Sequence, residues 1–312
     1  MASPDELLIA ARGLSRTYGE RRVLHDIDVA VRRGEVVGFL GPNGAGKSTT
    51  MRILSGVLAP SGGTVHIAGI DLLEHPIAAK RRIGYLPEQP PVYRELAVDE
   101  YLRYCARLHS VPAAAARSAL ARAKERCGLQ EVGARLIGSL SKGYQQRLGI
   151  AQAIIHSPEV VILDEPTVGL DPIQIREIRQ LIRELRTDHG VLLSTHILPE
   201  VQAVCDRVVL INAGRIVLDA TLAALSEATR GWRVRLRRPP PIETLKSLDG
   251  VQRVDVLDAQ CFLIAGPRLD SEELARRCVG ADWGLIELAP QDRSLEEVFL
   301  RVTSGDLAAE AA

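Results

Sequence analysis

The sequence predicts an α/β fold, in which strands and helices alternate along most of the chain. Three observations support this prediction. Short apolar runs separated by polar turns occur at 7–11, 23–31 and 35–40. The third run ends in a glycine-rich turn, and a helical pattern follows it at 47–57. The alternation of strand and helix returns after residue 159, and this order is the building unit of α/β proteins.

The remaining elements of the α/β body follow from the same patterns. Two further strands are expected at 64–67 and 83–86. In the second half we expect strands at 160–163 and 191–194, helices at 173–186 and 199–205, and a hairpin of 207–212 with 215–219 around Ala213-Gly214.

The middle of the chain, about residues 90–157, has a different character. It is rich in Ala and Arg, and its apolar residues recur at helical spacing. We therefore predict a helical subdomain inserted into the α/β body. The apolar positions that carry this pattern are Leu102, Ala106, Leu120, Ala123 and Cys127.

A second, smaller domain is predicted at 231–304. A polar, proline-rich segment at 237–241 is expected to form a surface connection. The order of elements, βαββαβ plus a helix, suits a small ferredoxin-like α+β unit, and no constellation of polar residues indicates catalysis there. We expect a regulatory or dimer-supporting role. The predicted elements are strand 232–236, helix 242–248, strands 251–257 and 262–265, helix 271–278, strand 285–288 and helix 295–302, before a frayed tail at 305–312.

The bulk composition limits the classes of function. The 312 residues are enough for two domains, and 39 Lys and Arg balance 39 Asp and Glu. A balanced charge gives no electrostatic reason to expect nucleic acid as a partner. No stretch approaches the ~18 apolar residues that span a bilayer, so any membrane function requires a separate spanning subunit. The five widely spaced cysteines are expected to be buried thiols in a reducing compartment.

A phosphate-binding loop is the clearest motif in the sequence. Its glycines let the backbone wrap around phosphate oxygens, while the following helix presents its positive end. Lys47 is expected to contact the β- and γ-phosphates, the Ser48 hydroxyl to ligate Mg²⁺, and Thr49 to contact phosphate. The loop reads Gly41-Pro42-Asn43-Gly44-Ala45-Gly46-Lys47-Ser48 and fits the pattern of Gly, four residues, Gly, Lys and Ser or Thr.

Two acids follow the apolar strand 160–163. A buried strand at this point places Asp164 at its carboxyl end, beside the phosphate loop, where it can hold Mg²⁺. Glu165 is one residue further on and can polarise an attacking water molecule. The two carboxylates and the loop together predict hydrolysis of a nucleoside triphosphate.

A third motif, Leu140-Ser141-Lys142-Gly143-Tyr144, resembles the Leu-Ser-Gly-Gly-Gln signature of the ABC ATPases. It departs from the signature at the third and fifth positions but keeps Ser141 and Gly143, which matter most for phosphate contact. Ser141 is also a good N-cap, and the helix expected at 145–155 presents its positive end to an anion.

The resemblance covers about residues 6–225 and implies a fold and further site residues. It implies a RecA-like P-loop NTPase core with an antiparallel β subdomain, binding ATP with Mg²⁺. Tyr18 matches the aromatic residue that stacks on adenine, and Asp171, in Gly169-Leu170-Asp171, the loop that crosses the dimer interface. His196 matches the switch histidine that contacts the γ-phosphate.

One position departs from the family. Where the family usually has Gln in the loop that joins the core to the helical subdomain, this chain has Glu88, followed by Gln89. Either side chain could reach Mg²⁺ and the attacking water. A carboxylate there would add negative charge near the nucleotide and strengthen metal dependence.

The signature variant, the segment 84–88 and the segment 294–299 look like the ABC-2 exporter branch, and within it like gliding-motility-type ATP-binding subunits. The resemblance implies a head-to-tail homodimer in which Ser141 and Gly143 of one copy complete the phosphate loop of the other. It also implies a transmembrane permease, docked near 88–95, and a peripheral location on the cytoplasmic face of the inner or plasma membrane. Drug, lipid, polysaccharide and protein export all remain open.

A soluble regulatory ATPase of the same family, not tied to a membrane channel, is the alternative. Translation factors of the family resemble two ATPase units in tandem, and this chain has one. Chromosome-maintenance members need a long coiled coil between phosphate loop and signature, and the spacing from Lys47 to Ser141 is too short for one.

Overall fold

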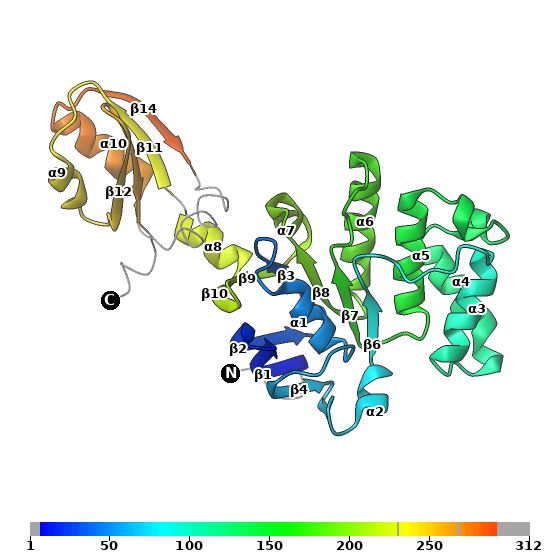
Figure 1. Cartoon of the computed structure of the whole chain (residues 1–312). Coiled ribbons are helices and arrows are strands. Elements are labelled where there is room, and N and C mark those ends of the chain that lie inside the picture. The colour runs from blue at the N-terminus through cyan, green and yellow to red at the C-terminus, as the bar shows by residue number, and fades with distance from the viewer. Residues whose placement is uncertain (1–6, 230, 267–268, 292–312) are drawn as a thin grey trace. The chain divides into compact units, whose positions relative to one another are not determined.

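The computed structural model describes residues 7–229, 231–266 and 269–291 of the chain (Figure 1). The chain forms two compact units that divide between Asp219 and Ala220. The predicted helix at 295–302 and the tail at 305–312 lie outside the described residues.

The first unit is built around a six-stranded sheet. Strand pairs β3–β8, β3–β9, β7–β8 and β6–β7 are parallel, and β9 and β10 form the predicted hairpin. Parallel strands that are buried on both faces consist of continuous apolar residues. This is why the strands at 160–163 and 191–194 could be predicted from the sequence. In sheet order the strands are β10 (Arg215–Thr221), β9 (Arg207–Asn212), β3 (Val36–Leu40), β8 (Gly190–Thr195), β7 (Val160–Asp164) and β6 (Ile83–Leu86).

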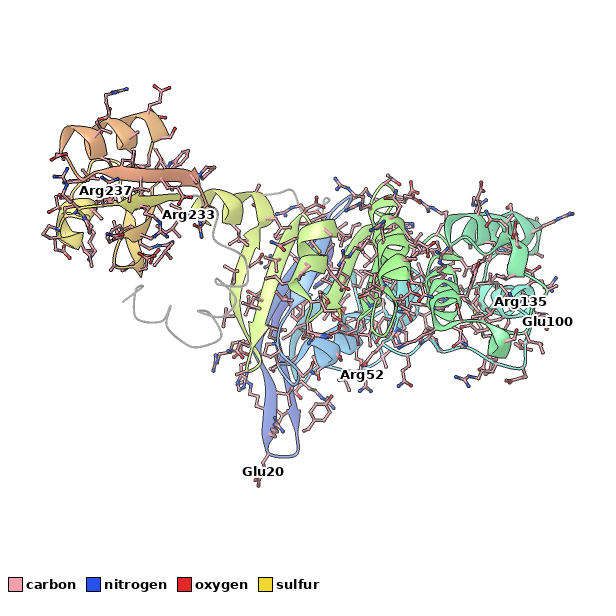
Figure 2. All side chains as sticks on the ribbon, turned by 90° about the horizontal axis from the view of Figure 1, so that it is seen from above. Glu20, Arg52, Glu100, Arg135, Arg233 and Arg237 are labelled. Carbon is pink, nitrogen blue, oxygen red and sulfur yellow. The ribbon has the colours of Figure 1, made fainter. Side chains whose placement is uncertain are left out.

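A second, antiparallel sheet packs beside the first and forms the predicted β subdomain. Its first strand is longer than the predicted 7–11, because it continues through a bulge at Gly13, whose amide donates to the Asp28 carboxylate at 2.7 Å. The hairpin between the first two strands carries Glu20 at its tip (Figure 2). In sheet order the strands are β2 (Arg21–Arg32), β1 (Leu7–Tyr18), β4 (Gly62–Ile67) and β5 (Ile70–Asp71).

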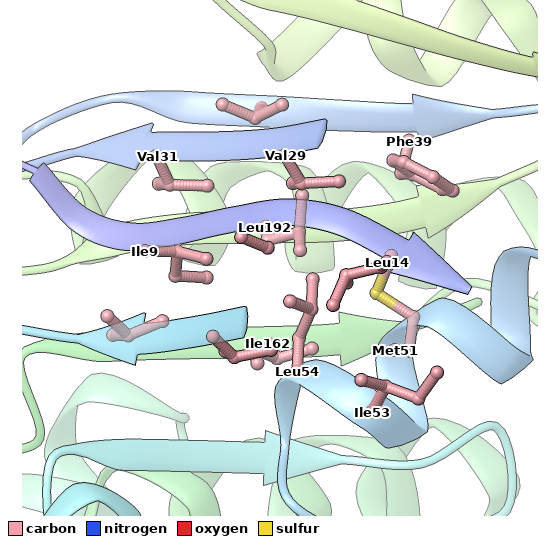
Figure 3. Close-up of a cluster of buried hydrophobic side chains, with 14 of the residues drawn as sticks. Ile9, Leu14, Val29, Val31, Phe39, Met51, Ile53, Leu54, Ile162 and Leu192 are labelled. Carbon is pink, nitrogen blue, oxygen red and sulfur yellow. The ribbon is translucent and has the colours of Figure 1, made fainter. Parts of the chain in front are cut away.

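Helix α1 (Lys47–Leu54) lies between the two sheets and supplies the centre of the core. Figure 3 shows its Met51 and Leu54 side chains against Leu14 of β1 and against Ile162 and Leu192 of the parallel sheet. Burial of these apolar side chains on both sheets holds the start of α1 in a fixed position relative to the strand ends. The helix ends before the predicted Val57, since Gly56 takes a left-handed φ of 71°.

The remaining helices of the first unit cover the other face and one edge of the parallel sheet. Helices α6 (Pro172–Leu185) and α7 (Leu198–Val204) lie on the face opposite α1, and the predicted helical insertion gathers beyond β6 (Figure 1). The insertion comprises α3 (Val98–Leu108), α4 (Ala113–Arg126), the short 3-10 turns Gln130–Val132 and Ile137–Ser139, and α5 (Lys142–Ile154). Two short helices were not predicted: α2 (Pro76–Lys80) of the first unit, and α8 (Leu222–Thr229), which belongs to the second unit.

The second unit has the predicted βαββαβ order. All its strand pairs are antiparallel, and the order β12-β13-β11-β14 is the ferredoxin-like arrangement. Val234, Phe262 and Ile264 pack against Leu245 and Leu274 of the two helices. The elements are β11 (Gly231–Leu236), α9 (Ile242–Lys246), β12 (Arg253–Asp258), β13 (Cys261–Ala265), α10 (Ser271–Gly280) and β14 (Leu285–Pro290).

The predicted fold class is thereby confirmed, with its α/β core, antiparallel β subdomain, helical insertion and α+β unit. All five cysteines are buried and unbridged, as predicted; they are Cys105, Cys127, Cys205, Cys261 and Cys278.

Candidate nucleotide-binding site

The phosphate loop joins the carboxyl end of β3 to the start of α1. Gly44 and Gly46 take φ angles of 79° and 112°, which side chains rarely adopt. At Gly46 a Cβ atom would also lie 2.6 Å from Leu24, whereas at Gly44 nothing lies within 4 Å of that position. The glycines therefore shape the loop as predicted.

A cavity of about 540 Å³ opens above this loop. Most of the residues predicted from the sequence meet here, although they come from distant parts of the chain. The cavity is lined by Tyr18, Arg21, Val23, Asn43, Gly44, Gly46, Lys47, Ser48, Thr49, Glu88, Glu165, Val168 and His196. Gly41, Pro42 and Ala45 belong to the loop but do not line the cavity: Gly41 packs against the backbone of Ile211, and Ala45 is buried.

The Lys47 ammonium group is buried within the loop. Its Nζ atom donates to the carbonyl oxygens of Gly41 at 2.8 Å and Pro42 at 3.3 Å, and lies 3.5 Å from Oε1 of Glu165. These contacts fix the ammonium group at the cavity wall, as a fixed positive charge for phosphate oxygens.

Ser48 and Asp164 bring two oxygen-bearing side chains together beside the phosphate loop. Ser48 Oγ donates to Asp164 Oδ1 at 3.4 Å, and Ser194 Oγ donates to the same carboxylate oxygen at 2.5 Å. Burial raises the pKa of Asp164, the two hydroxyl hydrogen bonds lower it, and the nearby charges of Glu165 and Glu88 raise it. A hydroxyl and a carboxylate under several negative charges suit a hard divalent cation such as Mg²⁺.

Glu165 and His196 both line the cavity and are in contact with each other. Nδ1 of His196 lies 2.9 Å from Oε2 of Glu165, while the Glu165 amide donates to Ser194 Oγ at 3.0 Å. Glu165 also takes a positive φ of 48°, which is unusual for a residue with a side chain. Backbone of this kind concentrates at functional sites, where surrounding contacts hold it in place. Glu165 and His196 were predicted from two separate motifs, and the fold brings them into contact.

The structure distinguishes Glu88 from Gln89, the two candidates for the position at which the family usually has Gln. Glu88 lines the cavity above the phosphate loop. Gln89 does not; it lines a neighbouring cavity of about 660 Å³, together with Glu88, Lys142 and Gln145.

Ser141, Gly143 and Asp171 do not line the cavity of their own chain. Ser141 caps α5 by accepting a hydrogen bond from the Tyr144 amide at 3.4 Å, and Asp171 caps α6 through the amides of Ile173 and Gln174. Both caps are exposed. α5 starts at Lys142 rather than at the predicted 145, so the signature motif itself forms its first turn.

Four residues of the site were not predicted from the sequence: Ser194, Arg21, Val23 and Val168. Ser194 could have been found, because it is a polar residue at the end of an otherwise apolar strand, as Asp164 is. In the sheet the two residues are register partners on β7 and β8. Arg21, Val23 and Val168 carry no motif, and only the fold brings them to the cavity.

A glycine-rich loop between a central parallel strand and a helix, with a carboxylate on a nearby strand end, defines a P-loop nucleoside triphosphatase. Comparison with known proteins narrows this class. The family model for ABC transporters matches residues 24–168. A Bacillus subtilis ABC transporter ATP-binding protein, YdbJ, is 34% identical and covers 97% of both chains. This chain therefore belongs to the ABC transporter ATP-binding subunits, as its motifs predicted.

Other relatives agree with the predicted ABC-2 exporter branch. The daunorubicin resistance ATP-binding protein DrrA3 of Streptomyces coeruleorubidus is 34% identical over 96% of both chains. The bacitracin transport ATP-binding protein BcrA of Bacillus licheniformis is 36% identical over 72% of this chain and 73% of its own. The likeness to gliding-motility-type subunits stays a prediction.

Solved structures support the same fold. The structure of an ATP-binding subunit of an ABC transporter superposes with a TM-score of 0.64 at 34% identity, over 70% of this chain and 91% of its own. The dimeric structure of MJ0796, a bacterial ABC transporter cassette, superposes with a TM-score of 0.62 at 25% identity, over 69% of this chain and 98% of its own. In the described part of our chain, no helix combines the length and apolar character needed to cross a membrane.

Proposed function

We propose that this chain hydrolyses ATP and thereby drives export through a separate transmembrane permease. The observation that carries the proposal is the single cavity in which Lys47, Glu165 and His196 converge. Relatives named for bacitracin transport and daunorubicin resistance support export as the process served. In this proposal residues 6–225 are the ATP-binding domain, residues 90–157 its helical subdomain, and residues 231–304 an accessory domain.

The nucleotide is held mainly by groups of the phosphate loop. The backbone amides from Gly41 to Ser48 and the amino end of α1 bind the phosphates, with Lys47 at the β and γ positions and Thr49 beside them. Tyr18 stacks on adenine; the Arg16 guanidinium lies 4.7 Å from its ring centroid, which helps to hold the ring. Ser48 and Asp164 hold Mg²⁺, which when bound neutralises phosphate charge.

Hydrolysis is assigned to the pair of Glu165 and His196. Glu165 orients and polarises the attacking water, because its carboxylate reaches the cavity while its backbone is fixed by Ser194. His196 keeps Glu165 oriented through Nδ1 and contacts the γ-phosphate as the cycle proceeds. Glu88, rather than Gln89, is the residue from the connecting loop that faces the water and the metal site.

Each cavity is half of a working site. The exposed caps Ser141 and Asp171, together with Gly143 of the signature, serve the nucleotide of a second copy in a head-to-tail dimer. At Gly143 a Cβ atom would lie 2.6 Å from the end of the flexible Gln174 side chain, which extends from the first turn of α6. ATP closes the dimer and hydrolysis opens it.

The permease docks in the cleft near 88–95, where the second cavity lies between the connecting loop and α5. The chain then works on the cytoplasmic face of the inner or plasma membrane, without nucleic acid as a partner. We assign the accessory domain a regulatory or dimer-supporting role.

The test is the variant Glu165→Gln. It should keep ATP binding, lose turnover by a factor of about 10² or more, and accumulate an ATP-bound dimer in size-exclusion chromatography. Lys47→Ala should lose nucleotide binding, while Lys246→Ala, an exposed lysine on α9, should change neither property. Turnover at the wild-type rate in Glu165→Gln would show that another group is the base.

A further inference from the structure

A buried carboxylate behind the cavity is not explained by the roles assigned so far. Glu200 lies in the first turn of α7 and is 2% exposed. In the described part of the chain it forms no ion pair. A carboxylate in such a place is costly unless hydrogen bonds satisfy its oxygens.

Two buried threonines satisfy one oxygen each. Thr167 Oγ1 donates to Glu200 Oε1 at 2.5 Å, and Thr195 Oγ1 donates to Glu200 Oε2 at 2.8 Å. Thr195 Oγ1 in turn accepts from the Ile197 amide at 3.0 Å. The hydroxyl of Thr195 is thus fully oriented: it accepts from one side and donates to the carboxylate on the other.

The two threonines belong to the two segments that carry the catalytic pair. Thr167 is two residues after Glu165, in the loop that runs on to Asp171. Thr195 ends β8 and directly precedes His196. Thr167 and Thr195 are 28 positions apart in the sequence, and a single side chain contacts both.

We infer that Glu200 is a positioning residue that ties the Glu165 loop to the His196 segment, so that the two keep their 2.9 Å contact while the site closes. The inference rests on the proposed function, since it assigns Glu200 to the hydrolysis step. A buried polar group generally contributes less to stability than a well-packed apolar one, so geometry is the better explanation for a carboxylate here.

Both carboxylate oxygens of Glu200 act as acceptors. A carboxylate accepts from two hydroxyl groups at once, whereas a glutamine amide offers one acceptor oxygen and an NH₂ donor. In Glu200→Gln one threonine hydroxyl must turn and accept from the NH₂ group, so a hydrogen bond to a charged carboxylate is replaced by a weaker neutral one, although the side chain keeps its volume. The variant weakens the link with little change in packing.

The test compares Glu200→Gln, Thr167→Val and Thr195→Val in the full chain. We expect kcat to fall about ten-fold or more in Glu200→Gln, with affinity for a fluorescent ADP analogue within about two-fold of wild type. Adding Thr167→Val to Glu200→Gln should cost less than the product of the two single effects, because both changes act on the same link. Gln202→Ala, an exposed position on the same helix, is the matched control.

Hydrogen exchange of backbone amides gives a second readout that does not depend on activity. Exchange at 167–170 and at Ile197 should be faster in Glu200→Gln, while exchange in α1 stays unchanged. Unchanged exchange in both segments, or an unchanged kcat beside an active wild type, overturns the inference. So does an equal loss of kcat, nucleotide affinity and melting temperature, since that is a general folding defect. A folded wild type without ATPase activity instead contradicts the proposed function. In that case the exchange data still show whether Glu200 ties the Glu165 loop to the His196 segment.

Discussion

Nδ1 of His196 lies 2.9 Å from Oε2 of Glu165, and Oε1 of the same carboxylate lies 3.5 Å from the Lys47 ammonium group. Glu165 is therefore held between a ring nitrogen and a buried cation. This arrangement keeps the carboxylate at one point of the cavity wall. In the proposed mechanism, His196 and Glu165 therefore act as a unit.

The first prediction concerns this pair. His196→Ala should lower kcat about 10²-fold with little change in nucleotide affinity, because it frees the Glu165 carboxylate without touching the phosphate loop. Steady-state ATPase assays and ADP titrations measure the two quantities. Combining His196→Ala with Glu165→Gln should cost much less than the product of the single effects. Fully multiplicative losses would mean that the residues act independently.

A second prediction separates Glu88 from Gln89. Glu88→Gln removes one negative charge from the cavity, so metal-free ATP should bind about three- to ten-fold more tightly, and the gain in affinity on adding Mg²⁺ should shrink. Isothermal titration with and without Mg²⁺ measures this. Gln89→Ala is the control, because Gln89 lines the neighbouring cavity instead. An effect in Gln89→Ala alone would reverse the assignment.

The third prediction tests the half-site. Lys47→Ala and Ser141→Arg should each abolish turnover alone. When equal amounts are mixed, half of the dimers should be mixed, and each mixed dimer should have one intact site made of an unaltered loop and an unaltered signature. ATPase activity should then return to about a quarter of wild type at most. No recovery, under conditions where cross-linking detects mixed dimers, would argue against the head-to-tail arrangement.

The fourth prediction concerns stability at low pH. His109 and His156 stack with ring centroids 3.8 Å apart, and His156 Nε2 lies 3.1 Å from the Ile83 carbonyl oxygen. Burial lowers the pKa of His156 to about 4, with the neighbouring His109 adding to the effect, and burial also lowers the pKa of His109. Between an unfolded pKa of about 6.5 and these lowered values the unfolded chain binds more protons, so stability present above pH ~6.5 is lost as the pH falls toward about 4.

Urea unfolding between pH 8 and pH 4 measures this dependence. His156→Gln removes the titrating ring, but the glutamine can still donate a hydrogen bond to the Ile83 carbonyl. The loss of unfolding free energy between pH 8 and pH 4 should therefore be smaller in the variant than in wild type, by on the order of 1 kcal/mol. His75→Gln, at an exposed histidine, should leave the slope as in wild type. Identical slopes in all three proteins would assign the pH dependence to other groups.

Those parts of the site that are continuous in the chain could be predicted from the sequence. The loop from Gly41 to Ser48 is local, because its glycines and Lys47 act through neighbouring backbone. The apolar run ending in Asp164 and Glu165 is equally local, since a buried parallel strand must be apolar along its whole length. The order of these motifs was enough to predict the fold class and the family.

The folded structure was needed to show which residues from separate segments meet. Ser194 contacts Asp164 across 30 positions because β7 and β8 pair in one particular register. Glu200 joins Thr167 to Thr195 because α7 folds back over both strand ends, and Glu88 faces the cavity while Gln89 does not. Contacts of this kind depend on strand register and helix placement, which arise from packing of the whole core and leave no local pattern in the sequence.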